Sequence, residues 1–180
     1  EPDELDQNIW LLNCGNGTVD LSTGELRDHS RADYITKLIP TPYDREARAP
    51  RWEKFLEEIQ PDPEVRAFLR RAVGYSLTGC IDEHVLFFLY GEGANGKNTF
   101  LDTLVRLLPG YAQYGAPNLI NRKEGDHPTD IADLAGARFV IVNEVSGARL
   151  NEEFVKGATG DAKAKARRMR EDFWEFVQTY

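Results

Sequence analysis

Short apolar runs alternate with turn residues in the first forty positions of the chain, which is typical of β-structure. An apolar run at 9–12 is followed by Asn16-Gly17, a dipeptide typical of two-residue hairpin turns. Residues 34–39 have the composition of another strand, which ends where prolines begin. These features predict a small β-meander near the start of the chain.

Apolar residues then recur with the spacing of one helix face in two consecutive segments, 50–60 and 63–78. Each segment begins at a proline, which suits the first turn of a helix, and Gly79 suits a C-terminal cap. We therefore predict a pair of amphipathic helices whose apolar faces serve packing. Tryptophans are expected in the core, with no indication of a base-stacking role, at positions 10, 52 and 174.

The pattern next changes to alternating strands and helices. Residues 85–90 are six apolar residues in a row, as expected for a strand buried on both faces of a parallel sheet. A helix is expected over 100–108, a second buried strand over 139–142, and a further strand over 173–177. The predicted fold class is α/β, and the predicted units are a β-meander and linker (1–48), a helical subdomain (49–80) and a partial nucleotide-binding core (81–180).

Composition and charge narrow the functional class. With 180 residues, of which 41% are hydrophobic, the chain can bury a core, and its formal charge of −8 argues against a histone-like or polybasic membrane protein. Residues 156–170 nevertheless hold six Lys or Arg and a single Asp. This basic segment on an acidic chain favours an anionic partner, although a solvated basic face is the simpler interpretation.

Other polar residues indicate no further chemistry. Two cysteines, Cys14 and Cys80, are too few for a disulfide framework or a four-cysteine zinc site, and inert thiols are expected. The cluster of Asp126, His127 and nearby aspartates lacks the spacing of a metal site. No apolar run approaches the roughly 20 residues that span a bilayer.

The most informative stretch is GEGANGKNT at 91–99, which matches the pattern G-x-x-x-x-G-K. Glycines let successive backbone N–H groups point at phosphate oxygens, and the following helix directs its positive N-terminal end at the same anion. Lys97 can reach the outer phosphates of a nucleoside triphosphate. An apolar run before the loop and an amphipathic helix after it favour this interpretation over an ordinary glycine-rich turn. The candidate nucleotide-binding residues are Gly91, Gly93, Ala94, Asn95, Gly96, Lys97, Asn98 and Thr99.

A phosphate loop also needs a carboxylate at the end of a neighbouring strand. Glu144 follows the apolar run 139–142 and is the candidate for this catalytic and metal-binding role, unless it only begins a solvated loop. Asn98 stands where the pattern has the Ser or Thr whose hydroxyl binds Mg²⁺, and Asn143 stands where many such sites have a second acid. Nucleotide binding is therefore better supported than magnesium-dependent hydrolysis.

Taken together, these segments resemble the C-terminal, superfamily 3 helicase region of phage and plasmid primase–helicases. The resemblance extends over nearly the whole chain. It rests on GTVDLSTGEL (17–26), AVGYSLTG (72–79), LYGEGANGKNTFL (89–101), GARFVIVNE (136–144) and the stretch 156–176.

The resemblance implies an AAA+-like ATPase that uses ATP and Mg²⁺, assembles as a ring, commonly a hexamer, and unwinds DNA by moving along one strand. It also implies that a primase domain can lie upstream and that the protein acts in the cytoplasm of a bacterial host. By position, Gly91, Gly96 and Lys97 match the Walker A motif and Glu144 the acidic end of Walker B. The basic segment matches a channel-lining loop, with DNA-binding candidates Lys163, Lys165 and Arg167.

The family's sensor strand and arginine finger are expected after the last residue, Tyr180, and the chain begins at Glu1 without a methionine. We therefore expect a fragment of a helicase with feeble or no ATP hydrolysis of its own. Two other classes stay open. One is a nucleotide-binding assembly or DNA-binding module without productive hydrolysis, which Asn98 and Asn143 favour. The other is a metabolite kinase, which the basic segment disfavours.

Overall fold

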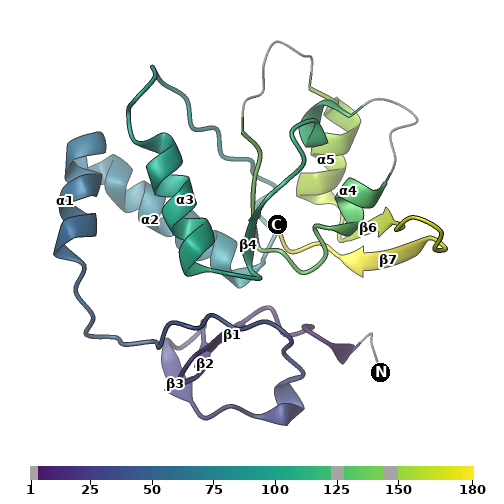
Figure 1. Ribbon diagram of the computed structural model, residues 1–180, viewed down its shortest axis with the longest axis horizontal. Coiled ribbons are helices and arrows are strands. Elements are labelled where there is room, and N and C mark those ends of the chain that lie inside the picture. Colours follow the sequence, from purple (N-terminus) through teal and green to yellow (C-terminus); the bar gives the residue numbers. More distant parts are fainter. Residues whose placement is uncertain (1–3, 123–127, 144–149) are drawn as a thin grey trace.

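The computed structural model describes residues 4–122, 128–143 and 150–180, and these residues form a mixed α/β structure with small sheets (Figure 1). The described strands are β1 (Leu11–Cys14), β2 (Gly17–Asp20), β3 (Glu25–Arg27), β4 (Ala112–Tyr114), β5 (Phe139–Ile141), β6 (Lys163–Ala166) and β7 (Trp174–Val177). The described α-helices are α1 (Pro50–Ile59), α2 (Pro63–Thr78), α3 (Lys97–Leu107), α4 (Thr129–Ala132) and α5 (Glu152–Gly160). Short 3₁₀ helices occupy η2 (Arg31–Asp33) and η3 (Leu119–Asn121).

The predicted β-meander is confirmed as the antiparallel sheet β1–β2–β3. Its first turn is Gly15-Asn16, one residue earlier than the Asn-Gly signal indicates, because Cys14 pairs with Gly17. The Asn16 side chain accepts from the backbone N–H of Tyr43 at 2.8 Å and donates to the carbonyl of Tyr43 at 2.9 Å. These bonds attach the turn to the segment that leads toward α1.

The predicted strand at 34–39 is wrong. This segment contributes one isolated bridge, in which Ile39 lies beside Cys14 and its N–H donates to the carbonyl of Asn13 at 2.9 Å. The third strand of the sheet is instead β3, which directly follows β2 through a tight turn. Of the apolar residues at 34–39, Ile39 is buried in the core, whereas Tyr34 and Leu38 are exposed.

The two amphipathic helices are confirmed as α1 and α2, with boundaries set by caps. Asp62 accepts hydrogen bonds from two N–H groups of the first turn of α2, and Gly79 ends that helix in a left-handed conformation (φ 68°). Neither helix contains a fully buried residue. Their apolar faces are therefore only half-covered, and Trp52, expected in the core, is half-buried on α1.

The main core cluster is shared between the meander and the α/β part of the chain. Buried residues of both parts pack together in this cluster: Leu12, Cys14, Val19, Ile39, Leu108, Tyr111 and Ala112. It therefore connects the sheet β1–β2–β3 to the end of α3 and to β4.

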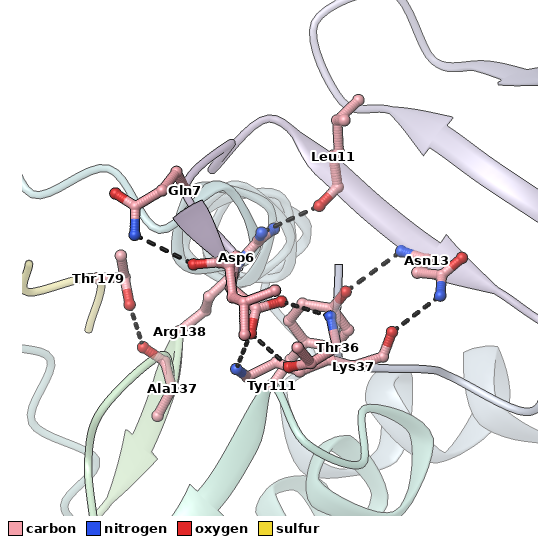
Figure 2. Close-up of polar contacts among 11 residues, drawn as sticks. Asp6, Gln7, Leu11, Asn13, Thr36, Lys37, Tyr111, Ala137, Arg138 and Thr179 are labelled. Carbon is pink, nitrogen blue, oxygen red and sulfur yellow. Dashed lines mark hydrogen bonds and ion pairs between the residues drawn. The ribbon is translucent and has the colours of Figure 1, made fainter. Parts of the chain in front are cut away.

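Arg138, which directly precedes β5, reinforces this junction (Figure 2). Its guanidinium donates to the carbonyl of Leu11 at 2.9 Å and to the carbonyl of Leu77 at 2.8 Å, and it lies 4.8 Å from the centre of the Tyr111 ring. The Tyr111 hydroxyl in turn accepts from the backbone N–H of Asn13. Burial lowers the pKa of Arg138 below its ordinary value. One buried cation thus joins the meander, the end of α2 and the strand that leads toward the predicted acidic residue.

The second described sheet is the parallel pair β4–β5, which confirms the strand predicted at 139–142. The strand predicted at 85–90 is wrong: these residues form a loop between α2 and α3 with no strand partner among the described residues (Figure 1). All six side chains are exposed, including Phe88 at 60% and Tyr90 at 92%. A strand buried on both faces requires other elements to cover both of those faces, and the exposure of all six side chains shows that the described residues do not cover this segment.

The exposure of this loop predicts that Phe88→Lys changes the free energy of unfolding by less than about 0.5 kcal/mol, as for other surface positions. Phe100 is 6% exposed in α3, so Phe100→Lys is the matched comparison and should cost about 3 kcal/mol or more. Chemical denaturation of both variants checks this difference. A cost for Phe88→Lys as large as that for Phe100→Lys would show that 85–90 is buried after all.

Candidate nucleotide-binding site

The glycine-rich loop at 91–96 connects the exposed apolar segment to α3. Positive φ angles occur at Gly91 (148°), Ala94 (58°) and Gly96 (82°), so the chain turns sharply before the helix begins at Lys97. Glycine adopts such angles without steric cost, and alanine does so only under strain. The local sequence therefore produces the loop-to-helix geometry that the pattern predicts.

Gly96 lies against α1 so closely that no larger residue fits. A Cβ atom at this position would clash with Cγ2 of Ile59 and would lie 3.3 Å from the ring of Phe55. Combined with its positive φ, this approach makes glycine necessary at position 96. Helix α1 therefore supports the loop directly, which the sequence does not indicate.

The ammonium group of Lys97 lies inside the loop. Its Nζ donates to the carbonyls of Gly91 (3.0 Å) and Glu92 (3.2 Å) and to Oδ1 of Asn95 (2.8 Å). The residue before α3 is Gly96, which has no side chain that could accept hydrogen bonds from the N–H groups of the first turn. A cation and a helix N-terminus without a side-chain cap thus occur together at this loop, a combination that suits an anion.

A large hollow, with a volume of about 1340 Å³, connects this loop to the end of β5. The predicted residues Gly93 to Thr99 line it, and so do Val142 and Asn143. The structure therefore brings Lys97 and Asn98 to the same hollow as Asn143. Gly91 is not among the lining residues but contacts the ammonium of Lys97 through its carbonyl. Glu144 lies outside the described residues.

A polar cluster beside this hollow is not predicted from the sequence. The hydroxyl of Tyr114, at the end of β4, donates to Oδ1 of Asp102 on α3, and the side chain of Asn143 also hydrogen-bonds to Tyr114. The hydrogen bond to Asp102, together with burial, raises the pKa of Tyr114 above its ordinary value. This cluster fixes the ends of both parallel strands relative to α3. The only signal in the sequence is an Asp five residues after the lysine, which is too common to be diagnostic.

The predicted DNA-binding residues come together on a second feature, the antiparallel hairpin β6–β7 (Figure 1). Lys163 and Lys165 alternate with Ala164 and buried Ala166, so both lysines project from one face of the hairpin. Phe173, just before β7, is exposed, and the ammonium of Lys165 lies 5.4 Å from its ring centre. This face therefore combines cations with an accessible aromatic ring.

Arg167 lies on the same hairpin but in a different environment. Its guanidinium is 4.8 Å from the centre of the Phe173 ring, and its side chain is half-buried. The Nε atom is buried and has no hydrogen-bond partner among the described residues. Arg167 is thus less available to a ligand than the two lysines, and it helps to fix the position of Phe173.

The described residues contain no group of three or more His, Cys, Asp or Glu that could hold a metal ion. In the cluster that the sequence contains here, Asp130 pairs with Arg122 at 3.3 Å, whereas Asp126 and His127 lie outside the described residues. Both cysteines are free thiols, and burial raises the pKa of Cys14. In the described part of the chain, no helix has the length and apolar character needed to cross a membrane.

Comparison with known proteins adds a family context. A family model described as D5 N terminal like matches residues 1–61, which comprise the meander and α1. The chain is 29% identical over 172 residues to Putative helicase L207/L206 of Acanthamoeba polyphaga mimivirus, and the alignment covers 91% of this chain and 18% of that protein. It is 31% identical over 101 residues to Putative helicase 184R of Invertebrate iridescent virus 6, covering 53% of this chain and 10% of that protein.

The chain spans less than a fifth of the length of these curated relatives. The alignment with the mimivirus protein nevertheless extends over most of this chain, including the glycine-rich loop. The family model matches only as far as residue 61, just after the end of α1. The chain is therefore similar to viral proteins named as helicases, and its first third is similar to the D5 N terminal family.

Proposed function

We propose that this chain is the ATP-binding part of a helicase-type DNA replication protein. In this proposal, residues 91–99 bind the phosphates of ATP and the β6–β7 hairpin binds single-stranded DNA. The observation that supports the proposal most strongly is the shared hollow, which both Lys97 and Asn143 line. Ligands of open α/β sheets bind outside the carboxyl ends of parallel strands, which is where Asn143 lies. The names of the two viral relatives favour the same function.

In this proposal the loop holds the phosphates through its backbone and Lys97. The N–H groups at the start of α3 point at the anion, and the Lys97 ammonium exchanges its contacts with the carbonyls of Gly91 and Glu92 for phosphate oxygens. Asn95 Oδ1 keeps the ammonium oriented during this exchange. The loop residues remain where the helix α1 supports them.

A magnesium ion would be held mainly by the nucleotide. The amide oxygens of Asn98 and Asn143 are hard donors that suit Mg²⁺, and both side chains are exposed toward solvent. When bound, the ion would neutralise charge on the outer phosphates. Glu144 is the candidate to complete this site and to orient the attacking water, and its role remains part of the proposal.

In the intact protein, the proposal includes a ring, commonly a hexamer, in which a sensor strand and an arginine finger complete each site. A second candidate is a nucleotide-dependent assembly or DNA-binding module without productive hydrolysis. Asn98 favours this candidate because an amide replaces the hydroxyl that normally binds the metal. The two candidates share the nucleotide site and differ in whether Mg²⁺ takes part in it.

The β6–β7 hairpin is the proposed DNA contact. Lys163 and Lys165 are exposed on one face, where they can reach successive phosphates without reading base sequence. Phe173 offers an aromatic ring beside them, and rings of this kind stack with bases of any sequence. Arg167 would hold Phe173 in position and would contact DNA phosphates less directly than the two lysines.

The nucleotide site predicts saturable ATP binding that Lys97→Ala weakens about 10- to 100-fold, because a charge-assisted bond to phosphate is removed. Isothermal titration calorimetry of the 180-residue chain, with and without Mg²⁺, measures this change. Lys54→Ala is the matched control, because Lys54 is exposed on α1 and pairs only weakly with Glu58 at 3.9 Å. Tighter ATP binding in the presence of Mg²⁺ supports the helicase. An ATP affinity that is the same with and without Mg²⁺ supports the module without productive hydrolysis. Equal affinities for the Lys97→Ala and Lys54→Ala chains would contradict the proposed site.

The hairpin predicts that the double variant Lys163→Ala/Lys165→Ala binds an oligothymidine strand more weakly than the unsubstituted chain. The slope of log affinity against log salt should decrease in magnitude by about 0.7 for each phosphate that the variant no longer neutralises. Fluorescence anisotropy over a range of salt concentrations measures this slope. If the slope is the same in the double variant and in Lys54→Ala, the lysines do not bind phosphates and the hairpin is only a solvated basic face.

A further inference from the structure

A second, smaller hollow lies beside the glycine-rich loop, between the start of α1 and the first turns of α3. Its volume is about 560 Å³, and its walls are mostly apolar. Trp52 and Phe55 form the wall on α1, and Thr99 and Thr103 form the wall on α3. This volume lies in the range of small-ligand sites in proteins.

The two hollows adjoin. Phe55 and Thr99 line both of them, and Thr99 follows Lys97 by only two residues in the first turn of α3. In loops of this pattern the lysine reaches the outer phosphates and the backbone N–H groups hold the inner ones. The nucleoside is attached at the inner end of this phosphate chain. The hollow that begins at Thr99 is therefore next to the loop and within reach of a nucleoside.

The walls of the smaller hollow have the chemistry that a nucleobase requires. The ring of Trp52 stacks with Phe55 (5.3 Å between ring centres, 28° between planes) and with Phe100 (5.8 Å, 10°). Phe100 is buried, so it holds Trp52 in place while Trp52 itself is only half-buried. A fixed and partly accessible aromatic wall suits a flat ring with apolar faces. The exposed Arg51 at the rim adds a cation that can contact a ring or its polar edge.

We infer that the base of the bound nucleotide lies in this smaller hollow, in contact with Trp52 and Phe55. The inference rests on the proposed function, because it assigns the nucleoside end of a nucleotide whose phosphates occupy the loop. It also gives α1 a second role: this helix supports Gly96 through Ile59 and contacts the base through Trp52.

The test compares ATP with inorganic tripolyphosphate, which has the phosphates and no base. Trp52→Ala should weaken ATP binding about 5- to 150-fold, the effect expected for one base–aromatic contact. The same variant should change tripolyphosphate binding by less than about twofold, a factor worth only a few tenths of a kcal/mol. Trp10→Ala is the matched control. Trp10, expected in the core, is 44% exposed just before β1 and lines neither hollow, so this variant should affect neither ligand. Both affinities are measured by calorimetry on the full 180-residue chain.

A second variant is needed in case Trp52→Ala does not fold, because that substitution removes the stacking of Trp52 with Phe100. Thr103→Phe keeps Trp52 and fills the hollow from α3, so it should weaken ATP binding and leave tripolyphosphate binding unchanged. If both variants bind ATP as tightly as the unsubstituted chain, or lose both ligands equally while folded, the inference is wrong although the phosphate site stands. If the unsubstituted chain binds neither ligand, the proposed function fails together with this inference.

Discussion

The close approach of Gly96 to Ile59 is the constraint on which the rest of the site depends. At this point the backbone has a positive φ and leaves no space for a Cβ atom, so α1 packs directly on the last residue before α3. The contact fixes where α3 begins, and therefore where Lys97 and the first-turn N–H groups lie. It also brings the aromatic side chains of α1 next to Thr99. The loop is thus held by a helix that precedes it by more than thirty residues.

This arrangement gives the D5-like first third of the chain a part in the site. Residues 1–61 include α1, whose Ile59, Phe55 and Trp52 contact the loop or line the adjoining hollow. The same third shares its core with the end of α3 and with β4, and Arg138 connects β1 to the start of β5. The buried residues of the meander are therefore packed against elements that lead toward the large hollow, and one buried cation adds to this connection.

Local signals in the sequence predict the helices and the loop well. Proline and capping residues give the limits of α1 and α2, and the glycine pattern gives the turn before α3, because these features depend on neighbours a few residues away. The predictions fail where structure depends on distant partners. Residues 85–90 have the composition of a buried strand but no described strand pairs with them, and 34–39 supplies a single bridge.

The candidate site follows the same division. Position along the chain is enough to predict that Lys97 lies in the loop and that the lysines of β6 alternate onto one face of a strand, and the structure has both features. It does not identify Trp52, since helical periodicity assigns that residue to a packed face without saying how much of it stays accessible. Nor does it identify the contacts of Tyr114 with Asp102 and Asn143, because these join three elements that are far apart in sequence.

Amide hydrogen exchange, measured by mass spectrometry with and without saturating ATP and Mg²⁺, tests most directly whether the loop supported by α1 is the nucleotide site. We expect slower exchange in two separate segments, the loop with the first turns of α3 and the helix α1, while exchange in the β6–β7 hairpin stays unchanged without DNA. Slower exchange that is absent from the loop, or confined to segments away from both α1 and α3, would contradict this expectation.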